Sequence, residues 1–333
     1  GEKKIMMRKS ILPTNNTDST IKERIQNVIF VRHGIALHNI PPDPPDSITT
    51  TGTGECKHLQ NPELYDPPLV YQGKQQALHV GKKYQEWYRS SSCRSSFTSQ
   101  SKHHHHAGEV ELVVTSPLTR CIQTAMLAFL PGDRYTTTTM TPTTTIPTTT
   151  PPTTATTTTT TTTAAVSTEN ASILNNDDNN NNREPLFFCT DLCREAFGIN
   201  YPDKRRPRSL LMKYWPILYF DPTMKENDED WKLDIRETIN ELRHRISLFL
   251  HMLVQRNESV IVVVTHGVWM EVCLQMYFPE VVDHGKRRIY NSDMVAVDCV
   301  SSSSLSSLQY TTTTSGGDDE ERDFVRFENV RFI

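Results

Sequence analysis

Short apolar runs alternate with longer amphipathic segments along this chain. Runs rich in β-branched and aromatic residues predict buried strands, and they cover residues 26–32, 111–115, 185–190, 260–265, 289–300 and 324–332. Apolar residues spaced three or four positions apart predict helices over residues 73–89, 234–254 and 268–278. Ser116 followed by Pro117 predicts another helix, running to about Leu130, because serine caps helices and proline suits their first turn.

The alternation of strands and helices predicts the fold class. It is typical of a mainly parallel sheet with helices on both faces. We therefore expect an α/β fold with three layers, α/β/α. In such sheets ligands bind outside the carboxyl ends of the strands, so polar residues that directly follow a strand are candidates for a functional site.

Low-complexity segments interrupt this pattern. Threonine occupies 21 of the 28 positions from 136 to 163, and positions 175–182 hold only Asn and Asp. Such tracts lack the apolar side chains that would offset the entropy of ordering, so we expect a disordered insertion over residues 131–184. We also expect a disordered tail over residues 1–25 and a Ser/Thr-rich loop over residues 301–322. The insertion and the loop would interrupt a single domain that spans residues 26–333.

Composition and charge narrow the functional class. A net charge of −4 provides no overall field for nucleic acid or an anionic membrane, so we expect neither as a partner. No apolar run approaches the roughly 20 residues that span a bilayer. Seven cysteines without a C-x-x-C pair argue against a disulfide framework or a zinc ribbon and favour a reducing compartment, the cytoplasm. The chain begins at Gly1 without Met, which is compatible with a removed targeting peptide.

Residues suited to phosphate chemistry follow four of the predicted strands. They are Arg32-His33-Gly34, Ser116 to Arg120, Arg194-Glu195 and His266-Gly267. Arginine and protonated histidine bind phosphate oxygens, histidine can act as a nucleophile, and a glutamic acid can protonate a leaving oxygen. Each segment alone has a structural alternative: a solvated strand end, a surface arginine or an exposed carboxylate. The joint pattern, in this order, is far more specific than any one part.

Two other kinds of cluster have weaker functional interpretations. The run His103 to His106 could bind a transition metal, but its place beside homopolymer tracts favours repeat expansion. The basic triplets at 204–206 and 286–288 could contact an anionic substrate or be solvated surface. Cys189 and Cys193 are interpreted as small apolar fillers.

The motifs together resemble a known family. They are residues 31–34 (VRHG) with Asn39 six positions after His33, 115–125 (TSPLTRCIQTA), 192–198 (LCREAFG) and 264–267 (VTHG). Their order and strand context are similar to those of the histidine phosphatase superfamily, which includes the cofactor-dependent phosphoglycerate mutases. Residues 66–77 resemble a further segment of that family, and residues 194–206 with 231–237 resemble its eukaryotic phosphoglycerate-mutase-like branch. The resemblance covers about residues 28–278, the insertion excepted.

This resemblance implies a phosphoglycerate-mutase-like fold and a role for each matched residue. His33 would be the nucleophile that becomes phosphohistidine, and Glu195 would protonate the leaving oxygen. The residues around the phosphoryl group would be Arg32, Arg120 and His266. Further substrate-binding residues would be Asn39, Gly34 and Gly267.

The expected activity is hydrolysis of a phosphomonoester, on a phosphorylated small molecule or a phosphopeptide, without a metal or cofactor. A mutase-type phosphotransferase and a non-catalytic phospho-ligand-binding module are the alternatives. Two departures weaken the mutase alternative: Val268 replaces a residue that is generally polar in the mutases, and residues 194–198 (REAFG) lack their E-R-H-Y-G run. The substrate and the oligomeric state are left open by the sequence.

Overall fold

The computed structural model describes residues 23–41, 57–90, 109–130, 184–279, 288–302 and 325–333, which form a seven-stranded sheet with flanking helices. The strands are β1 (Glu23–Arg32), β2 (Leu112–Thr115), β3 (Leu186–Cys189), β4 (Tyr219–Phe220), β5 (Val260–Thr265), β6 (Met294–Ser302) and β7 (Val325–Phe332). The helices are α1 (Tyr71–Ser90), α3 (Thr119–Phe129), α4 (Arg208–Tyr214), α5 (Ile239–Val254) and α6 (Gly267–Tyr277). Short 3-10 turns lie at Leu37–Asn39, Lys57–Gln60, Pro62–Leu64, Asp191–Cys193 and Tyr201–Asp203.

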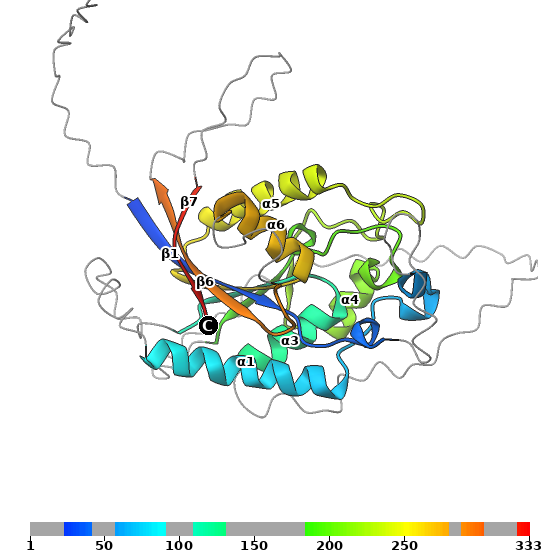
Figure 1. The fold of residues 1–333 in the computed structure, drawn as a ribbon, viewed down its shortest axis with the longest axis horizontal. Helices are drawn as coiled ribbons and strands as arrows, with labels where there is room; N and C mark the ends of the chain where they lie inside the picture. Colours follow the sequence, from blue (N-terminus) through cyan, green and yellow to red (C-terminus); the bar gives the residue numbers. More distant parts are fainter. Residues whose placement is uncertain (1–22, 42–56, 91–108, 131–183, 280–287, 303–324) are drawn as a thin grey trace, which may run out of the picture.

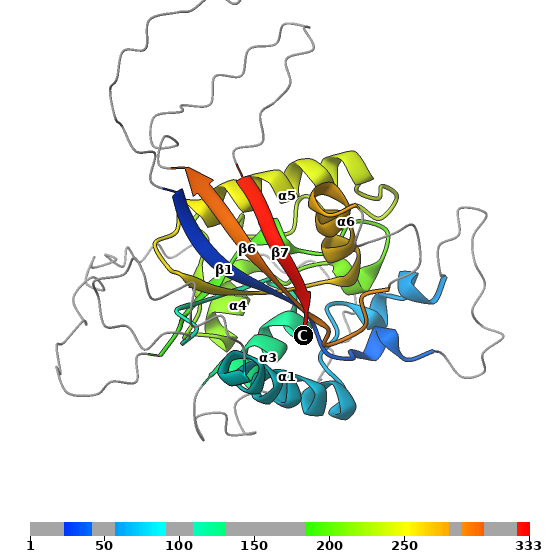
Figure 2. The ribbon, with the colours of Figure 1, turned by 60° about the vertical axis from the view of Figure 1, so that its left-hand side comes forward.

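The sheet is mainly parallel, with the strand order β4-β3-β2-β5-β1-β6-β7. The neighbouring strands from β4 to β1 all pair in parallel, whereas β6 and β7 add an antiparallel edge. Figures 1 and 2 show α5 and α6 on one face of the sheet and α1 and α3 on the other. The expected three-layer α/β/α fold is therefore confirmed.

The alternation of side chains along each strand produces these layers. In the central strand β5, Ile261 and Val263 pack with the core under α5 and α6. Val262 and Val264 pack with the core under α1, α3 and α4. Successive side chains of a strand point to opposite faces, so one continuous apolar run contributes to both cores.

Two predicted loop boundaries are wrong by a few residues. Residues 23–25 belong to β1 and not to the predicted tail 1–25, because their backbone pairs with β6 up to Ser302. For the same reason Ser301 and Ser302 belong to β6 and not to the predicted loop 301–322. Backbone hydrogen bonds thus continue both strands beyond their apolar residues. The remainder of the tail and loop, and residues 131–183 of the insertion, lie outside the described residues.

Three predicted elements begin later than expected. β6 starts at Met294, because the residues before it form a turn closed by a bond from Asp293 N to Tyr290 O. α5 starts at Ile239, because Thr238 and Glu241 form a capping box. α3 starts at Thr119 with Leu118 at its N-cap position, so the prediction that Ser116 caps this helix is wrong.

The sequence analysis did not predict two short elements. α4 has seven residues and β4 has two, too few for a periodic pattern to emerge.

None of the described helices combines the length and the apolar character needed to cross a bilayer. The five cysteines in the described ranges are buried free thiols.

Candidate active site

The predicted site segments meet at one edge of the sheet. β1, β2, β3 and β5 run parallel, so residues that follow them gather at their carboxyl ends. Arg32 at the end of β1 is in register with Thr265 at the end of β5. The residues that follow, His33 and His266, therefore lie side by side, with ring centroids 5.1 Å apart.

His33 has a defined tautomer. Its Nδ1 lies 2.7 Å from Gly34 O, and since a carbonyl oxygen only accepts, Nδ1 carries the proton. Nε2 is then the acceptor, and Arg120 Nε donates to it at 3.2 Å. Burial, followed by the charge of Arg120, lowers the pKa of His33 well below its ordinary value. The imidazole is therefore neutral at physiological pH, with a nucleophilic lone pair on Nε2.

Arg120 extends from α3 to this edge and is almost completely buried. Its Nη2 donates to Asp203 Oδ1 at 3.0 Å, and its Nη1 donates to Pro202 O at 2.5 Å. Asp203 accepts from Arg236 Nη1 at 2.9 Å through its other oxygen. A buried guanidinium needs a paired carboxylate, and Asp203 provides it while orienting the Nε edge of Arg120 toward His33.

The helix that carries Arg120 is capped from a distant segment. Asp66 accepts hydrogen bonds from Thr119 N at 2.7 Å and Thr119 Oγ1 at 2.6 Å. Arg206 Nε lies 2.9 Å from the same carboxylate. A negative charge at this position satisfies a first-turn donor and interacts favourably with the helix dipole. Asp66 thus has the capping role that the sequence analysis assigned to Ser116.

His266 is fully buried, and Ser116 contacts it instead of capping α3. The His266 Nε2 atom lies 2.8 Å from Ser116 Oγ and 3.3 Å from Cys121 Sγ. Burial, then the charges of Arg120 and His33, lower the pKa of His266 well below its ordinary value. A second neutral imidazole therefore faces His33.

Gly267 leaves room for the guanidinium of Arg32. A Cβ atom on Gly267 would lie 3.0 Å from Arg32 Cζ and 3.1 Å from Arg32 Nε, closer than ordinary contact. Arg32 Nη1 donates to Ile289 O, which holds the side chain against the start of α6. A direct contact between Gly267 and substrate stays a prediction.

Glu195 lies at the amino end of α6. Its carboxylate accepts from Val268 N at 3.3 Å, Trp269 N at 3.2 Å and Ala196 N at 3.1 Å. Burial, followed by the charge of Asp203, raises the pKa of Glu195, and Arg236 and Arg120 oppose that rise. The net rise favours the protonated acid, which is the form that a proton donor requires.

Gly34 and Asn39 make contacts within the protein. Gly34 N donates to Thr124 Oγ1 at 3.1 Å, and a Cβ atom on Gly34 would collide with the carbonyl of Gly73 in α1. Asn39 Oδ1 accepts from Ala36 N at 3.0 Å and closes a 3-10 turn. Their roles in substrate binding stay predictions.

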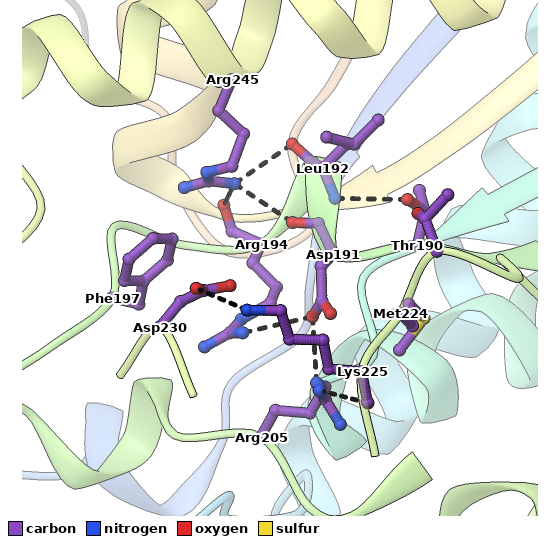
Figure 3. Close-up of a pocket in the computed structure, with 11 residues that line it drawn as sticks. Thr190, Asp191, Leu192, Arg194, Phe197, Arg205, Met224, Lys225, Asp230 and Arg245 are labelled. Atoms are coloured by element: carbon purple, nitrogen blue, oxygen red, sulfur yellow. Dashed lines mark hydrogen bonds and ion pairs between the residues drawn. The ribbon is translucent and has the colours of Figure 1, made fainter. Parts of the chain in front are cut away.

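A cavity of about 200 Å³ lies beside the Asp191–Cys193 turn, and the five predicted catalytic residues do not line it (Figure 3). Its buried arginines are paired with carboxylates. Arg194 Nη2 lies 2.8 Å from Asp228 Oδ2, and Arg245 Nη2 lies 2.6 Å from Glu237 Oε2. Arg245 Nη2 also donates to Glu195 O at 3.2 Å. We therefore interpret this region as the support of the segment that carries Glu195.

The basic triplet 204–206 has mixed roles. Arg205 is buried and donates to the carbonyl oxygens of Lys225 and Asn227. It is therefore neither a solvated surface residue nor a free contact for an anionic substrate. Lys204 Nζ lies 4.4 Å from the centroid of the Trp231 ring. Of the other triplet, residues 286 and 287 lie outside the described ranges.

Three residues of the site were missed by the sequence analysis. Asp203 and Arg236 lie in segments that carry the family resemblance, but no local pattern indicates which carboxylate pairs with an arginine 83 positions away. The His38 ring lies 5.9 Å from the His33 ring. Its only signal in the sequence is its place next to Asn39.

The assembled site is suited to a phosphoryl group. Arg32 and Arg120 can neutralise a phosphate dianion, and the neutral His33 next to Arg120 can accept the phosphoryl group. Among the described residues, no group of three or more His, Cys, Asp and Glu side chains could hold a metal ion. The run His103 to His106 lies outside those residues.

Sequence comparison relates the chain to phosphoglycerate mutase-like proteins. It is 28% identical over 247 residues to phosphoglycerate mutase-like protein 1 of Arabidopsis thaliana, which covers 73% of this chain and 69% of that protein. A second phosphoglycerate mutase-like protein of Arabidopsis thaliana is 26% identical over 268 residues, 80% of either chain. No protein-family model matches the chain. These relatives confirm the resemblance to phosphoglycerate mutase-like proteins.

Two mycobacterial proteins of known structure align with this chain at low identity. A glucosyl-3-phosphoglycerate phosphatase aligns over 83% of this chain and 91% of its own, with a TM-score of 0.38 and 13% identity. A mycobacterial hydrolase aligns over 93% of this chain and 89% of its own, with a TM-score of 0.41 and 12% identity.

Proposed function

We propose that the protein is a phosphatase that transfers a phosphoryl group from a phosphomonoester to His33 and then to water. The observation that carries the proposal is the state of His33 Nε2. It is an unprotonated nitrogen with a lone pair directed at Arg120 Nε, 3.2 Å away. A nucleophile that faces a phosphate-binding cation is suitably placed to attack a phosphorus atom held by that cation.

In the first step, substrate oxygens take over the hydrogen bond that Arg120 Nε donates to His33. The freed lone pair of Nε2 attacks phosphorus, and the bond from phosphorus to the leaving oxygen breaks. Arg32, Arg120 and His266 surround the equatorial oxygens of the transition state. The bond from His33 Nδ1 to Gly34 O stabilises the imidazole as it acquires positive charge.

Glu195 completes both steps by moving one proton. In its neutral form it protonates the leaving oxygen, and the backbone N–H groups of Val268 and Trp269 then stabilise the carboxylate that remains. In the second step the carboxylate takes a proton from the attacking water. The bond between phosphorus and Nε2 breaks, and inorganic phosphate leaves.

The reaction as proposed needs no metal, because Arg32 and Arg120 provide the positive charge that Mg²⁺ supplies in many phosphoryl transfers. The substrate class is a phosphorylated small molecule or a phosphopeptide. In the mutase alternative a second substrate hydroxyl, rather than water, accepts the phosphoryl group. Phosphate release without a bisphosphate primer separates the two reactions.

The test is a panel of phosphorylated metabolites and phosphopeptides assayed for phosphate release. The parent protein should form an acid-labile, base-stable phosphoenzyme during brief exposure to labelled substrate. His33→Ala should abolish both signals, whereas His244→Ala, on the exposed side of α5, should change neither. A His33→Ala variant that retains full turnover would overturn the mechanism.

A further inference from the structure

His38 has an unused hydrogen-bond donor next to the candidate nucleophile. The His38 ring lies 5.9 Å from the His33 ring, with 50° between their planes. The Nδ1 atom of His38 is buried and has no hydrogen-bond partner among the described residues. Buried polar atoms in folded proteins are nearly always paired, so this one needs an explanation.

The neighbouring asparagine determines which nitrogen of His38 carries the proton. Asn39 Oδ1 accepts from Ala36 N at 3.0 Å and from Asn291 Nδ2 at 3.4 Å, which fixes the orientation of the Asn39 amide. Asn39 Nδ2 is therefore the end that faces His38 Nε2, at 3.1 Å. An amide nitrogen only donates, so Nε2 is the acceptor and Nδ1 carries the hydrogen.

The charges around His38 keep its ring neutral. Burial, followed by the charges of Arg120 and Arg32, lowers the pKa of His38 well below its ordinary value. Both arginines belong to the candidate active site, so His38 lies within the field that attracts a phosphate. A neutral ring with Nδ1–H has one donor to offer and no acceptor for it within the described protein.

We infer that His38 Nδ1–H donates a hydrogen bond to a phosphoryl oxygen of the substrate, and that Asn39 is the positioning residue that holds His38 in this tautomer. The inference rests on the proposed function, since it takes the phosphate to occupy the space around His33. The sequence analysis expected Asn39 to bind the phosphoryl group directly. In the structure Asn39 Nδ2 faces His38 Nε2, and direct binding of the phosphoryl group by Asn39 stays a prediction.

Two substitutions at His38 separate its donor from its bulk. His38→Phe keeps a ring but removes the donor, and His38→Asn places an amide N–H near the position of Nδ1. A hydrogen bond to a charged acceptor is worth enough that His38→Phe should weaken the binding of inorganic phosphate by about 10-fold to 100-fold in calorimetry. His38→Asn should recover most of that loss. His79→Phe, on the exposed side of α1, is the matched control and should bind as the parent does.

Asn39→Asp tests the positioning role. The aspartate retains the acceptor for Ala36 N but presents an oxygen to His38 Nε2, which favours the tautomer with the hydrogen on Nε2 and leaves Nδ1 without a donor. Phosphate affinity should fall about as far as in His38→Phe. In the His38→Phe background, Asn39→Asp should have little further effect. Nitrogen-15 NMR of the free parent protein should show His38 protonated at Nδ1, a signal that a purely structural role for Asn39 would not require.

The outcomes distinguish this inference from the proposed function. Phosphate binding that is unchanged in His38→Phe, or an Nε2–H tautomer in the parent, overturns the inference while leaving turnover through His33 intact. If no phosphoenzyme forms and no phosphate is released, but phosphate binding still depends on His38, the proposed phosphatase activity is wrong. The contact between His38 and phosphate then stands. A parent protein that binds no inorganic phosphate overturns the contact itself.

Discussion

Replacing Asp203 by asparagine tests two effects of its carboxylate: it holds Arg120 in place, and it raises the pKa of Glu195. The side chain of Asp203 is 7% exposed and accepts from Arg120 at 3.0 Å and from Arg236 at 2.9 Å. Asparagine has nearly the same volume, but it removes the negative charge and turns one acceptor into a donor that faces an arginine N–H. The perturbation is therefore electrostatic, with little change in packing.

The expected loss of stability follows from the burial of Arg120. Removing one partner of a buried ion pair costs about 3–5 kcal/mol. Arg120 keeps its hydrogen bond to Pro202 O, so we expect a value at the lower end, about 3 kcal/mol. For a domain of this size, about 2–4 °C per kcal/mol converts this loss to a fall in Tm of roughly 6–12 °C.

The pH profile provides the more specific readout. After burial, the charge of Asp203 is the largest factor that raises the pKa of Glu195. Removing that charge lowers the pKa, so Glu195 loses its proton at a lower pH. A general acid acts only while protonated, and the basic limb of kcat/KM should therefore move to lower pH. The acidic limb belongs to neutral His33, whose lowered pKa keeps the parent protein active on the acidic side of neutral.

The assay follows an alkyl phosphate across pH in the parent, in Asp203→Asn and in a control, because an alkyl leaving group requires the proton that Glu195 donates. Titration of the substrate is common to all three, so differences between profiles belong to the enzyme. Asp298→Asn is the matched control, because it removes a partly exposed ion pair with Arg331 (2.7 Å) on the antiparallel edge of the sheet. Asp298→Asn should lower Tm less than Asp203→Asn does, and it should leave the pH profile of kcat/KM unchanged. A basic limb that stays in place or moves upward in Asp203→Asn would refute the reasoning.

Three further predictions follow from the same geometry. Glu195→Gln should slow alkyl phosphates by about 10²-fold to 10⁴-fold but aryl phosphates with good leaving groups much less, because the latter need little protonation; equal slowing of both would assign Glu195 another role. Gly267→Ala should displace the Arg32 guanidinium and reduce kcat/KM by about tenfold or more while Tm is unchanged or higher, and wild-type kinetics would contradict the close contact at 3.0 Å. A chelator should leave turnover unchanged, and activity that is lost and then restored by one metal would contradict charge neutralisation by the arginines alone.

The sequence by itself determined where six of the seven strands lie, and it placed the candidate site residues directly after them. Continuous β-branched runs such as 260–265 can only be stable when buried, and they form central strands because both of their faces are apolar. Parallel strands bring their carboxyl ends together, so His33 and His266 could be expected at one place from their positions after β1 and β5 alone. These are local patterns combined with a general rule of topology.

Only the tertiary structure decided the partners that make those residues useful. Asp66 caps α3 from 53 positions away, and Asp203 pairs with Arg120 across 83 positions. The hydrogen bonds of His38 likewise depend on where Asn39 and Asn291 meet. Propensity and periodicity act over a few residues, whereas a buried charge or an imidazole tautomer depends on whichever group the fold brings within about 3 Å. The sequence therefore predicted the position of the candidate nucleophile, and the fold set its protonation and its supporting contacts.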